Sequence, residues 1–298
     1  MTETRSKAAR PPRYVMLQKE RGETPLETLS KWKVANPEFA EVPASYAGRL
    51  DPMAEGKLLV LLGEECKKQA AYTKLDKEYE IEVLLDLKTD SGDVLGLVAQ
   101  QHTSANRFLN TNETNSNSHR SAPLVPSAKE LQTVLKHEIG RHSRRYPVFS
   151  SKTVSGKPLF LYALEGTLNT IQVPQHIETI YTIKLLKTEK VSTQELQKRI
   201  EQLLSKVPRS DEPSKLLGAD FRQDAVRAEW QKLFATLPAK QFTILKLRVI
   251  CGSGSYMRTL AERIGMSLGS TALALSINRT KIGHYVSLGL VSFWSKKY

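Results

Sequence analysis

Two short segments place polar residues where they could take part in chemistry. In Gly48-Arg49-Leu50-Asp51-Pro52 a carboxylate follows a glycine and precedes a proline. Asp-Pro is a common turn pair, so the pattern predicts a loop of defined shape that presents Asp51, and a simple turn is the alternative. Lys77-Glu78-Tyr79 stands where an alternating apolar stretch begins. A tyrosine at such a place is usually a core residue with its hydroxyl at the rim, and a role in a site is the alternative.

A third segment, Gly252-Ser253-Gly254-Ser255, opens a predicted helix that contains Arg258. Backbone N–H groups at a helix start can cradle a phosphate. The run lacks the Gly-Lys-Ser/Thr ending of a nucleotide-binding loop, so we do not expect ATP binding. Its serines are not spaced as in a Gly-x-Ser-x-Gly nucleophile elbow, which makes acyl hydrolysis a poor fit. The 6 histidines show no His-Glu-x-x-His pattern and no clustering with cysteine, so we expect no metal.

The charge of the chain favours a polyanionic partner. Its 298 residues include 44 Lys or Arg and 31 Asp or Glu, a formal net charge of +13. Such an excess is typical of nucleic-acid binding, although a solvated lysine face is the alternative. No apolar stretch is long enough to span a membrane. The 2 cysteines, Cys66 and Cys251, cannot form a disulfide framework or a four-cysteine zinc site, which indicates a reducing, cytoplasmic compartment.

Capping patterns predict where several helices begin. Thr24-Pro25-Leu26-Glu27 combines an N-cap, a proline in the first turn and a glutamate that completes a capping box. Ser127 and Ser192 are each followed three residues later by a glutamate, and apolar residues follow at helical spacing. A further helix is expected from Tyr256, ending at Gly269.

Alternating apolar residues predict strands over 79–87, 180–186 and 245–251, while 56–71 is ambiguous between strand and helix. In 180–186 the apolar Tyr181, Ile183 and Leu185 alternate with Thr182 and Lys184. Strands and helices are mixed without a regular βαβ order, so the fold class is α+β. We interpret 1–13 as a disordered basic tail and 14–298 as one domain with polar insertions near 103–122 and 207–223.

Taken in order, these segments resemble the TruB family of pseudouridine synthases, which modify the T-loop uridine of tRNA at position 55. The resemblance runs from about Val15 to Tyr285. Each motif alone is weak, and their shared order makes the resemblance specific. The motifs are Gly48–Pro52, Gly56–Leu59, Leu62–Lys68, Lys77–Tyr79, Thr89–Asp93, Pro147–Lys152, Gly156–Ala163, Gly254–Leu260 and Arg279–Gly283.

The resemblance implies a pseudouridine synthase fold, with a central mixed or antiparallel sheet, flanking helices and an RNA-binding cleft. It implies a reaction that needs no cofactor or metal, with Asp51 as the nucleophile. Arg258 has the place of the guanidinium that would hold this carboxylate bidentately, although a solvated arginine at a helix start is the alternative. Tyr79 would stack on the uracil, near the proton that leaves carbon 5. Tyr256 and Ile277 match positions that line the base pocket, and Ile277 could equally be core.

The implied partner is the T-arm of tRNA, with Lys19, Tyr46 and Arg49 as expected RNA contacts near the catalytic loop. We expect a monomer, no membrane association and no small-molecule cofactor. Lysines and arginines around the cleft would offset the cost of extruding the target base through phosphate contacts.

Some positions depart from the family pattern. Tyr46-Ala47-Gly48 stands where the family has His-Thr-Gly, and Lys19-Glu20 stands where it has Lys-Pro. Because 13 residues follow Tyr285, we expect no C-terminal RNA-binding domain. Gly48–Asp51 also resembles the Gly-Arg-Leu-Asp of ribosomal RNA pseudouridine synthases, which keeps that target open. A non-catalytic RNA-binding or chaperone protein on the same fold is a further alternative, but it would normally lack Asp51 or Arg258.

Overall fold

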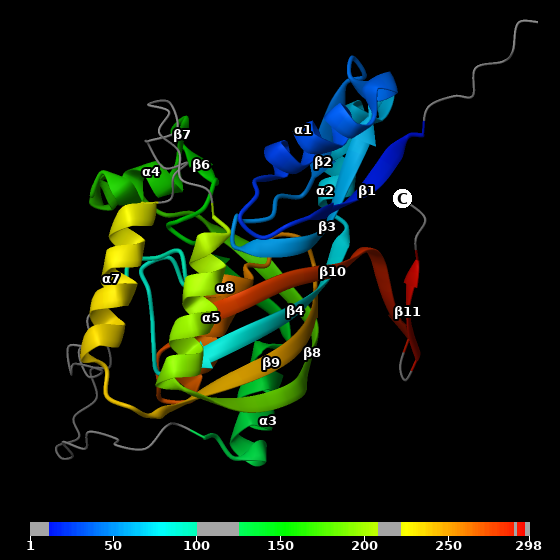
Figure 1. The fold of residues 1–298 in the computed structure, drawn as a ribbon. Helices are drawn as coiled ribbons and strands as arrows, with labels where there is room; N and C mark the ends of the chain where they lie inside the picture. The colour runs from blue at the N-terminus through cyan, green and yellow to red at the C-terminus, as the bar shows by residue number, and fades with distance from the viewer. Residues whose placement is uncertain (1–11, 100–124, 208–221, 289–290, 296–298) are drawn as a thin grey trace, which may run out of the picture.

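A mixed β-sheet is the centre of the molecule (Figure 1). The computed structural model describes residues 12–99, 125–207, 222–288 and 291–295. In this part of the chain nine strands form one sheet in the order β1-β3-β10-β4-β9-β8-β5, with β2 paired to β3 and β11 to β10. Only β3 and β10 run parallel among these pairs. The predicted α+β class with a mixed sheet is confirmed.

The strands of this sheet are β1 (Tyr14–Lys19), β2 (Ala44–Ala47), β3 (Ala54–Leu62), β4 (Asp76–Leu85), β5 (Gly140–Arg145), β8 (Gln175–Ser192), β9 (Gln241–Cys251), β10 (Ala272–Leu288) and β11 (Val291–Ser295). A separate hairpin pairs β6 (Thr153–Val154) with β7 (Lys157–Pro158). The helices are α1 (Pro25–Ala35), α2 (Gln69–Thr73), α3 (Ala128–Glu138), α4 (Leu159–Leu164), α5 (Thr193–Ser205), α7 (Gln223–Thr236) and α8 (Met257–Ser267), and the short 3₁₀ segments are η1 (Pro37–Phe39), η2 (Gly63–Lys68) and η3 (Leu168–Thr170).

Capping residues set the starts of the helices as predicted. Thr24, Ser127 and Ser192 each accept a hydrogen bond from the backbone of a glutamate three residues on, and each glutamate returns the bond. These reciprocal bonds satisfy donors that a helix start otherwise leaves unpaired. The N-cap of α8 is Tyr256, as expected, and Gly269 follows its C-cap with a φ of 71°.

Helices cover both faces of the sheet and bury two hydrophobic clusters (Figure 1). On one face Val83 packs with Leu131 of α3 and Ile264 of α8. On the other, the neighbouring Leu84 belongs to a cluster with Trp230 of α7 and side chains of α5. Because successive strand residues point to opposite faces, the end of β4 that is covered on both sides is a continuous apolar run, Val83-Leu84-Leu85.

The strand predicted over 180–186 is confirmed as part of β8, but its burial does not follow the alternation of apolar residues. Ile180 and Ile183 are buried, whereas Tyr181 and Leu185 are 38% and 42% exposed. Register shifts between 180 and 182 and between 185 and 187 break the alternation. Each β-bulge adds one residue to a strand and reverses the facing of the residues that follow it.

The ambiguous segment 56–71 divides between two kinds of structure. Its first part completes β3, which is buried almost throughout, and Gly63 then turns the chain into η2 and α2. Gly56 has a φ of 111°, and a Cβ there would collide with the backbone of Arg279 on β10. Close approach of two strands therefore requires glycine at this position.

Several predicted segments lie partly or wholly outside the described residues. The polar insertion at 103–122 lies wholly outside them, as do residues 1–11 and 208–221. At the borders, Arg13 donates two hydrogen bonds of 2.9 Å to Glu65, so this arginine belongs to the folded part. Val207 and Gln223, at the ends of the second predicted insertion, are buried. Among the helices that the structure describes, none is long and apolar enough to cross a membrane.

Glu65 provides a test of the N-terminal packing. Hydrogen bonds from Arg13 and then Tyr72 lower the pKa of Glu65 from 4.5 to about 2. A lowered carboxyl pKa stabilises the fold above pH 4.5, and this contribution is lost as the pH falls through the folded value. We predict that Glu65→Gln lowers the free energy of unfolding at pH 7, and that the difference from the parent shrinks between pH 4.5 and 2. Urea titrations across this range measure it.

The matched control is Glu64→Gln. Glu64 is 86% exposed and pairs with Lys67 on the surface, so its loss should change little at any pH. Equal curves for the two variants would contradict the role assigned to Glu65.

Candidate active site

Asp51 lies in the short connection between β2 and β3, and a buried arginine holds this connection from behind. The Arg279 side chain, 1% exposed, donates from Nε to Lys57 O at 2.7 Å. Its two terminal nitrogens donate to Arg49 O at 3.2 Å and Gly48 O at 3.3 Å. Gly48 has a φ of 85°, which turns its carbonyl toward this guanidinium at little steric cost. The predicted loop of defined shape is therefore present, and its shape depends on β10.

Lys19 is a second buried cation behind the same loop. It is 0% exposed, and Nζ donates to Ala54 O at 2.5 Å, Glu20 O at 3.0 Å and Pro52 O at 3.4 Å. Burial lowers the pKa of Lys19 to about 8. The expectation that Lys19 contacts RNA is wrong, because its ammonium is directed inward and donates hydrogen bonds to backbone carbonyls.

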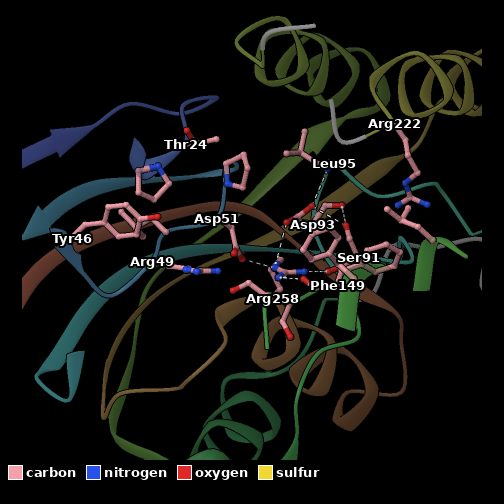
Figure 2. Close-up of a pocket in the computed structure, with 17 residues that line it drawn as sticks. Thr24, Tyr46, Arg49, Asp51, Ser91, Asp93, Leu95, Phe149, Arg222 and Arg258 are labelled. Carbon is pink, nitrogen blue, oxygen red and sulfur yellow. Dashed lines mark hydrogen bonds and ion pairs between the residues drawn. The ribbon is translucent and has the colours of Figure 1, made fainter. Parts of the chain in front are cut away.

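In front of the loop, Asp51 forms an ion pair with Arg258, at the start of α8 (Figure 2). Arg258 Nε donates to Asp51 Oδ2 at 2.8 Å. The arginine is 4% exposed, whereas the Asp51 side chain is 41% exposed. The alternative of a solvated arginine at a helix start is therefore wrong.

The contact between Arg258 and Asp51 is single, and the predicted bidentate pairing is wrong. Arg258 Nη1 donates to Ser91 O at 2.6 Å, and Nη2 donates to Phe149 O at 2.8 Å. With both terminal nitrogens committed to backbone carbonyls, only Nε reaches the carboxylate. The guanidinium thus joins the Asp51 loop to two other segments of the chain.

Asp93 is a second carboxyl group at this arginine. It is 4% exposed and its Oδ2 lies 3.5 Å from Arg258 Nε. Burial raises the pKa of Asp93, and the neighbouring guanidinium opposes that rise. Burial by itself would lower the pKa of Arg258, but Asp51 and Asp93 outweigh it and the pKa is raised. The arginine therefore stays charged.

Sequence reasoning did not single out Asp93 or Arg279. Both lie inside segments already noted as motifs, Thr89–Asp93 and Arg279–Gly283. The only available signal was their place in these motifs, since each motif holds a second charged residue and its composition does not show which one is buried. Their partners are distant in sequence, so only the fold identifies them.

Two cavities meet at Asp51. One has a volume of about 510 Å³ and the other about 660 Å³. The residues that line both cavities are Tyr46, Arg49, Leu50, Asp51, Ser150 and Ser151, so Asp51 lies where the two cavities adjoin. Tyr46 is partly buried and Arg49 is exposed. The first cavity, shown in Figure 2, has apolar walls that include Phe149 and Leu95.

The second cavity brings together the other predicted residues. Tyr79 from β4, Ile277 from β10 and Tyr256 before α8 all line it. Tyr79 is 8% and Ile277 4% exposed, so Ile277 is both a core residue and a cavity wall. Burial raises the pKa of Tyr79, and it raises that of Tyr256 to about 12. Both phenols therefore keep their protons at neutral pH, and this cavity offers flat, mostly apolar surfaces beside a carboxylate.

The glycine- and serine-rich run before α8 does not present a vacant helix start. Tyr256 N donates to the Glu178 carboxylate at 3.3 Å, and Arg263 of α8 pairs with the same carboxylate at 2.6 Å. Glu178 is 1% exposed. A carboxylate of the protein thus accepts from the N-cap N–H group at this helix start. No group of three or more His, Cys, Asp or Glu residues suited to a metal ion occurs among the described residues.

The site as a whole is a partly exposed carboxylate, fixed by a buried guanidinium, at the edge of a cavity with two neutral tyrosines. Such a carboxylate is suited to covalent catalysis on a flat ring substrate. The comparison with known proteins agrees with an enzyme that isomerises uridine in RNA. Residues 39–128 match the family model described as TruB family pseudouridylate synthase (N terminal domain).

Relatives extend this match to most of the chain. The tRNA pseudouridine synthase B of Borreliella burgdorferi (strain ZS7) is 24% identical over 272 residues, which are 91% of this chain and 70% of that protein. The protein of the same name from Ralstonia pickettii (strain 12J) is 25% identical over 249 residues, 84% of this chain and 56% of that protein. These matches make the chain similar to the TruB family of pseudouridine synthases over most of its length.

One similar solved structure is a Cbf5-Nop10-Gar1 complex. Its matching chain superimposes with a TM-score of 0.49 at 17% identity, covering 91% of this chain and 48% of that chain. The similarity of this chain to the TruB family therefore rests on the sequence matches and not on this superposition.

The hydrogen bonds of Arg258 give a prediction that concerns stability alone. In Arg258→Lys the ammonium can reach Asp51 but cannot also serve the carbonyls of Ser91 and Phe149. A buried acceptor without its donor costs about 1–3 kcal/mol, so we predict a loss of that size in the free energy of unfolding, measured by urea titration. Arg141→Lys, at an exposed position of β5, is the matched control. Equal stability of both variants would contradict the network.

Proposed function

We propose that this chain is a tRNA pseudouridine synthase that converts the T-loop uridine at position 55 to pseudouridine, with Asp51 as the nucleophile and without a cofactor or metal. The observation that carries the proposal is the Asp51–Arg258 pair, at 2.8 Å, at the junction of two cavities in a chain that is similar to the TruB family. The names of the relatives support tRNA as the substrate, and the T-loop position comes from the family resemblance alone.

The reaction rearranges one nucleotide. The bond between N1 of uracil and the sugar breaks, a bond between carbon 5 and the sugar forms, and the proton on carbon 5 leaves while N1 gains one. Asp51 would hold the intermediate covalently while the base turns over, by attack on either the sugar or the ring. Arg258 would keep the carboxylate charged and oriented in its partly buried position.

The uracil would occupy the second cavity. Tyr79 offers a ring face for stacking, and Tyr256 and Ile277 would close the sides of the pocket. Because burial raises the pKa of Tyr79, its hydroxyl would be neutral when the base binds. The Tyr79 side chain would then lie near carbon 5 as a protonated phenol.

The target base must leave its stack, at a cost of a few kcal/mol. Arg49 is exposed at the rim of both cavities and is the best placed of the proposed contacts to meet a phosphate. Tyr46 lies beside it and could pack against the neighbouring nucleotide. The net charge of +13 would add long-range attraction to RNA.

The first test is the substitution Asp51→Asn, which keeps the shape and removes the nucleophile. We predict normal folding and no pseudouridine in any RNA, measured by mapping pseudouridine in unmodified tRNA transcripts. Asp224→Asn, an exposed aspartate in the first turn of α7, is the matched control and should be fully active. Turnover by Asp51→Asn near the parental rate would remove Asp51 from the catalytic role.

The second test concerns the RNA target. A minimal T-arm stem-loop and a ribosomal RNA hairpin are incubated with the protein in the presence of a chelator. We predict that the stem-loop alone is modified, and that binding weakens steeply as salt rises, because RNA affinity depends on phosphate contacts. Modification of the ribosomal hairpin alone would instead favour a ribosomal RNA synthase, an alternative that the Gly48–Asp51 string also resembles.

A further inference from the structure

A second arginine, Arg222, reaches toward the site from the start of α7 (Figure 2). Its Nη1 donates to Asp90 Oδ2 at 2.7 Å and its Nη2 to Asp90 Oδ1 at 3.0 Å, a two-point contact. The guanidinium carbon also lies 4.8 Å from the centre of the Phe149 ring. Arg222 itself has a left-handed backbone, with a φ of 56°. An arginine that pairs bidentately and stacks on an aromatic ring joins two groups with little freedom.

The two residues that Arg222 contacts are linked directly to Arg258. Phe149 supplies the carbonyl that accepts Arg258 Nη2 at 2.8 Å. Asp90 precedes Ser91, whose carbonyl accepts Arg258 Nη1 at 2.6 Å. Both carbonyls that fix Arg258 therefore belong to segments that Arg222 joins. Arg258 in turn contacts Asp51 through Nε alone, so its orientation decides where the carboxylate lies.

The segment around Asp90 is held by α7 at two points. Trp230 of α7 donates from Nε1 to Val94 O at 3.0 Å, and Arg222 pairs with Asp90. Within the segment, Asp90 and Leu97 exchange hydrogen bonds of 3.1 and 2.9 Å. The 89–97 loop is therefore attached to α7 by both contacts. The Phe149 segment comes from a different part of the chain, and Arg222 connects it to this loop.

We propose that Arg222 is a positioning residue for the reaction: by joining Asp90 to Phe149 it places the two carbonyls that orient Arg258, and through Arg258 it orients Asp51. This inference rests on the proposed function of Asp51 and Arg258. It predicts an effect on the chemical step rather than on RNA binding, since Arg222 acts through other residues. Arg222 also lines the first cavity, so direct contact with RNA is the outcome against which the proposal must be tested.

The experiment measures kcat and KM of the full chain on a tRNA transcript for Arg222→Ala and Arg222→Lys. We expect kcat to fall about tenfold or more in Arg222→Ala, with KM within about twofold of the parent, because a small misplacement of reacting groups is costly. Arg222→Lys should recover only part of kcat, since an ammonium keeps the charge without the two-point contact. Lys232→Ala, which removes an exposed cation from the same helix, is the matched control. An unchanged kcat, or a raised KM with kcat intact, would overturn the positioning role.

Asp90→Asn provides a second variant in case Arg222→Ala does not fold. It keeps an oxygen for Leu97 N and weakens the pair with Arg222, so kcat should fall severalfold at unchanged KM. In the double variant Arg222→Ala/Asp90→Asn, the loss should be close to that of Arg222→Ala alone, because both changes break one contact. Fully additive losses would overturn the inference.

Asp51→Asn in the same assay separates the two hypotheses. If Asp51→Asn is inactive while Arg222→Ala has the parental kcat, only the positioning role fails. If Asp51→Asn turns over normally, the proposed function fails and this inference fails with it.

Discussion

The burial of Arg258 is the constraint on which the site depends. A guanidinium that is 4% exposed must have its nitrogens paired, because a buried charge without partners is strongly unfavourable. The partners are Asp51, the carbonyl of Ser91 and the carbonyl of Phe149. Each comes from a different segment, so satisfying this one side chain brings together the β2–β3 connection, the loop after β4 and the segment before α4. The carboxylate is then the only member of the network with a substantial exposed surface.

Behind Asp51, two further buried cations replace the hydrogen bonds that a loop normally makes to water. Arg279 serves the carbonyls of residues 48, 49 and 57, and Lys19 serves those of 20, 52 and 54. The loop therefore keeps these inward-facing carbonyls paired while Arg49 and Asp51 stay accessible on its outer side. Its position is defined from both sides, by backbone contacts behind and by a side-chain ion pair in front. A carboxylate held in this way needs little rearrangement to act in the proposed reaction.

The two cavities that adjoin at Asp51 predict how a nucleotide would be oriented in the site. The cavity with Tyr79, Tyr256 and Ile277 presents flat or apolar surfaces, whereas Arg49 at the shared rim is exposed and cationic. A nucleotide has a flat base and an anionic backbone. Its base would therefore lie against the tyrosines and Ile277, and its phosphate would lie near Arg49. The positive charge of the chain and its similarity to the TruB family agree with this orientation.

By itself, the sequence determined the features that depend on near neighbours. The capping boxes at Thr24, Ser127 and Ser192, the α+β class and the turn that carries Asp51 were all readable, because capping and periodicity act over a few residues. The tertiary structure decided the rest: the bulges that expose Tyr181, the burial of Lys19 and the single contact of Arg258 with Asp51. The Arg258–Asp51 contact joins residues 207 positions apart. The contact is single because the Nη1 and Nη2 groups of Arg258 donate to backbone carbonyls, which have no sequence signature. Because every backbone carbonyl is chemically the same, only the packing of the sheet and helices decides which ones a buried cation meets.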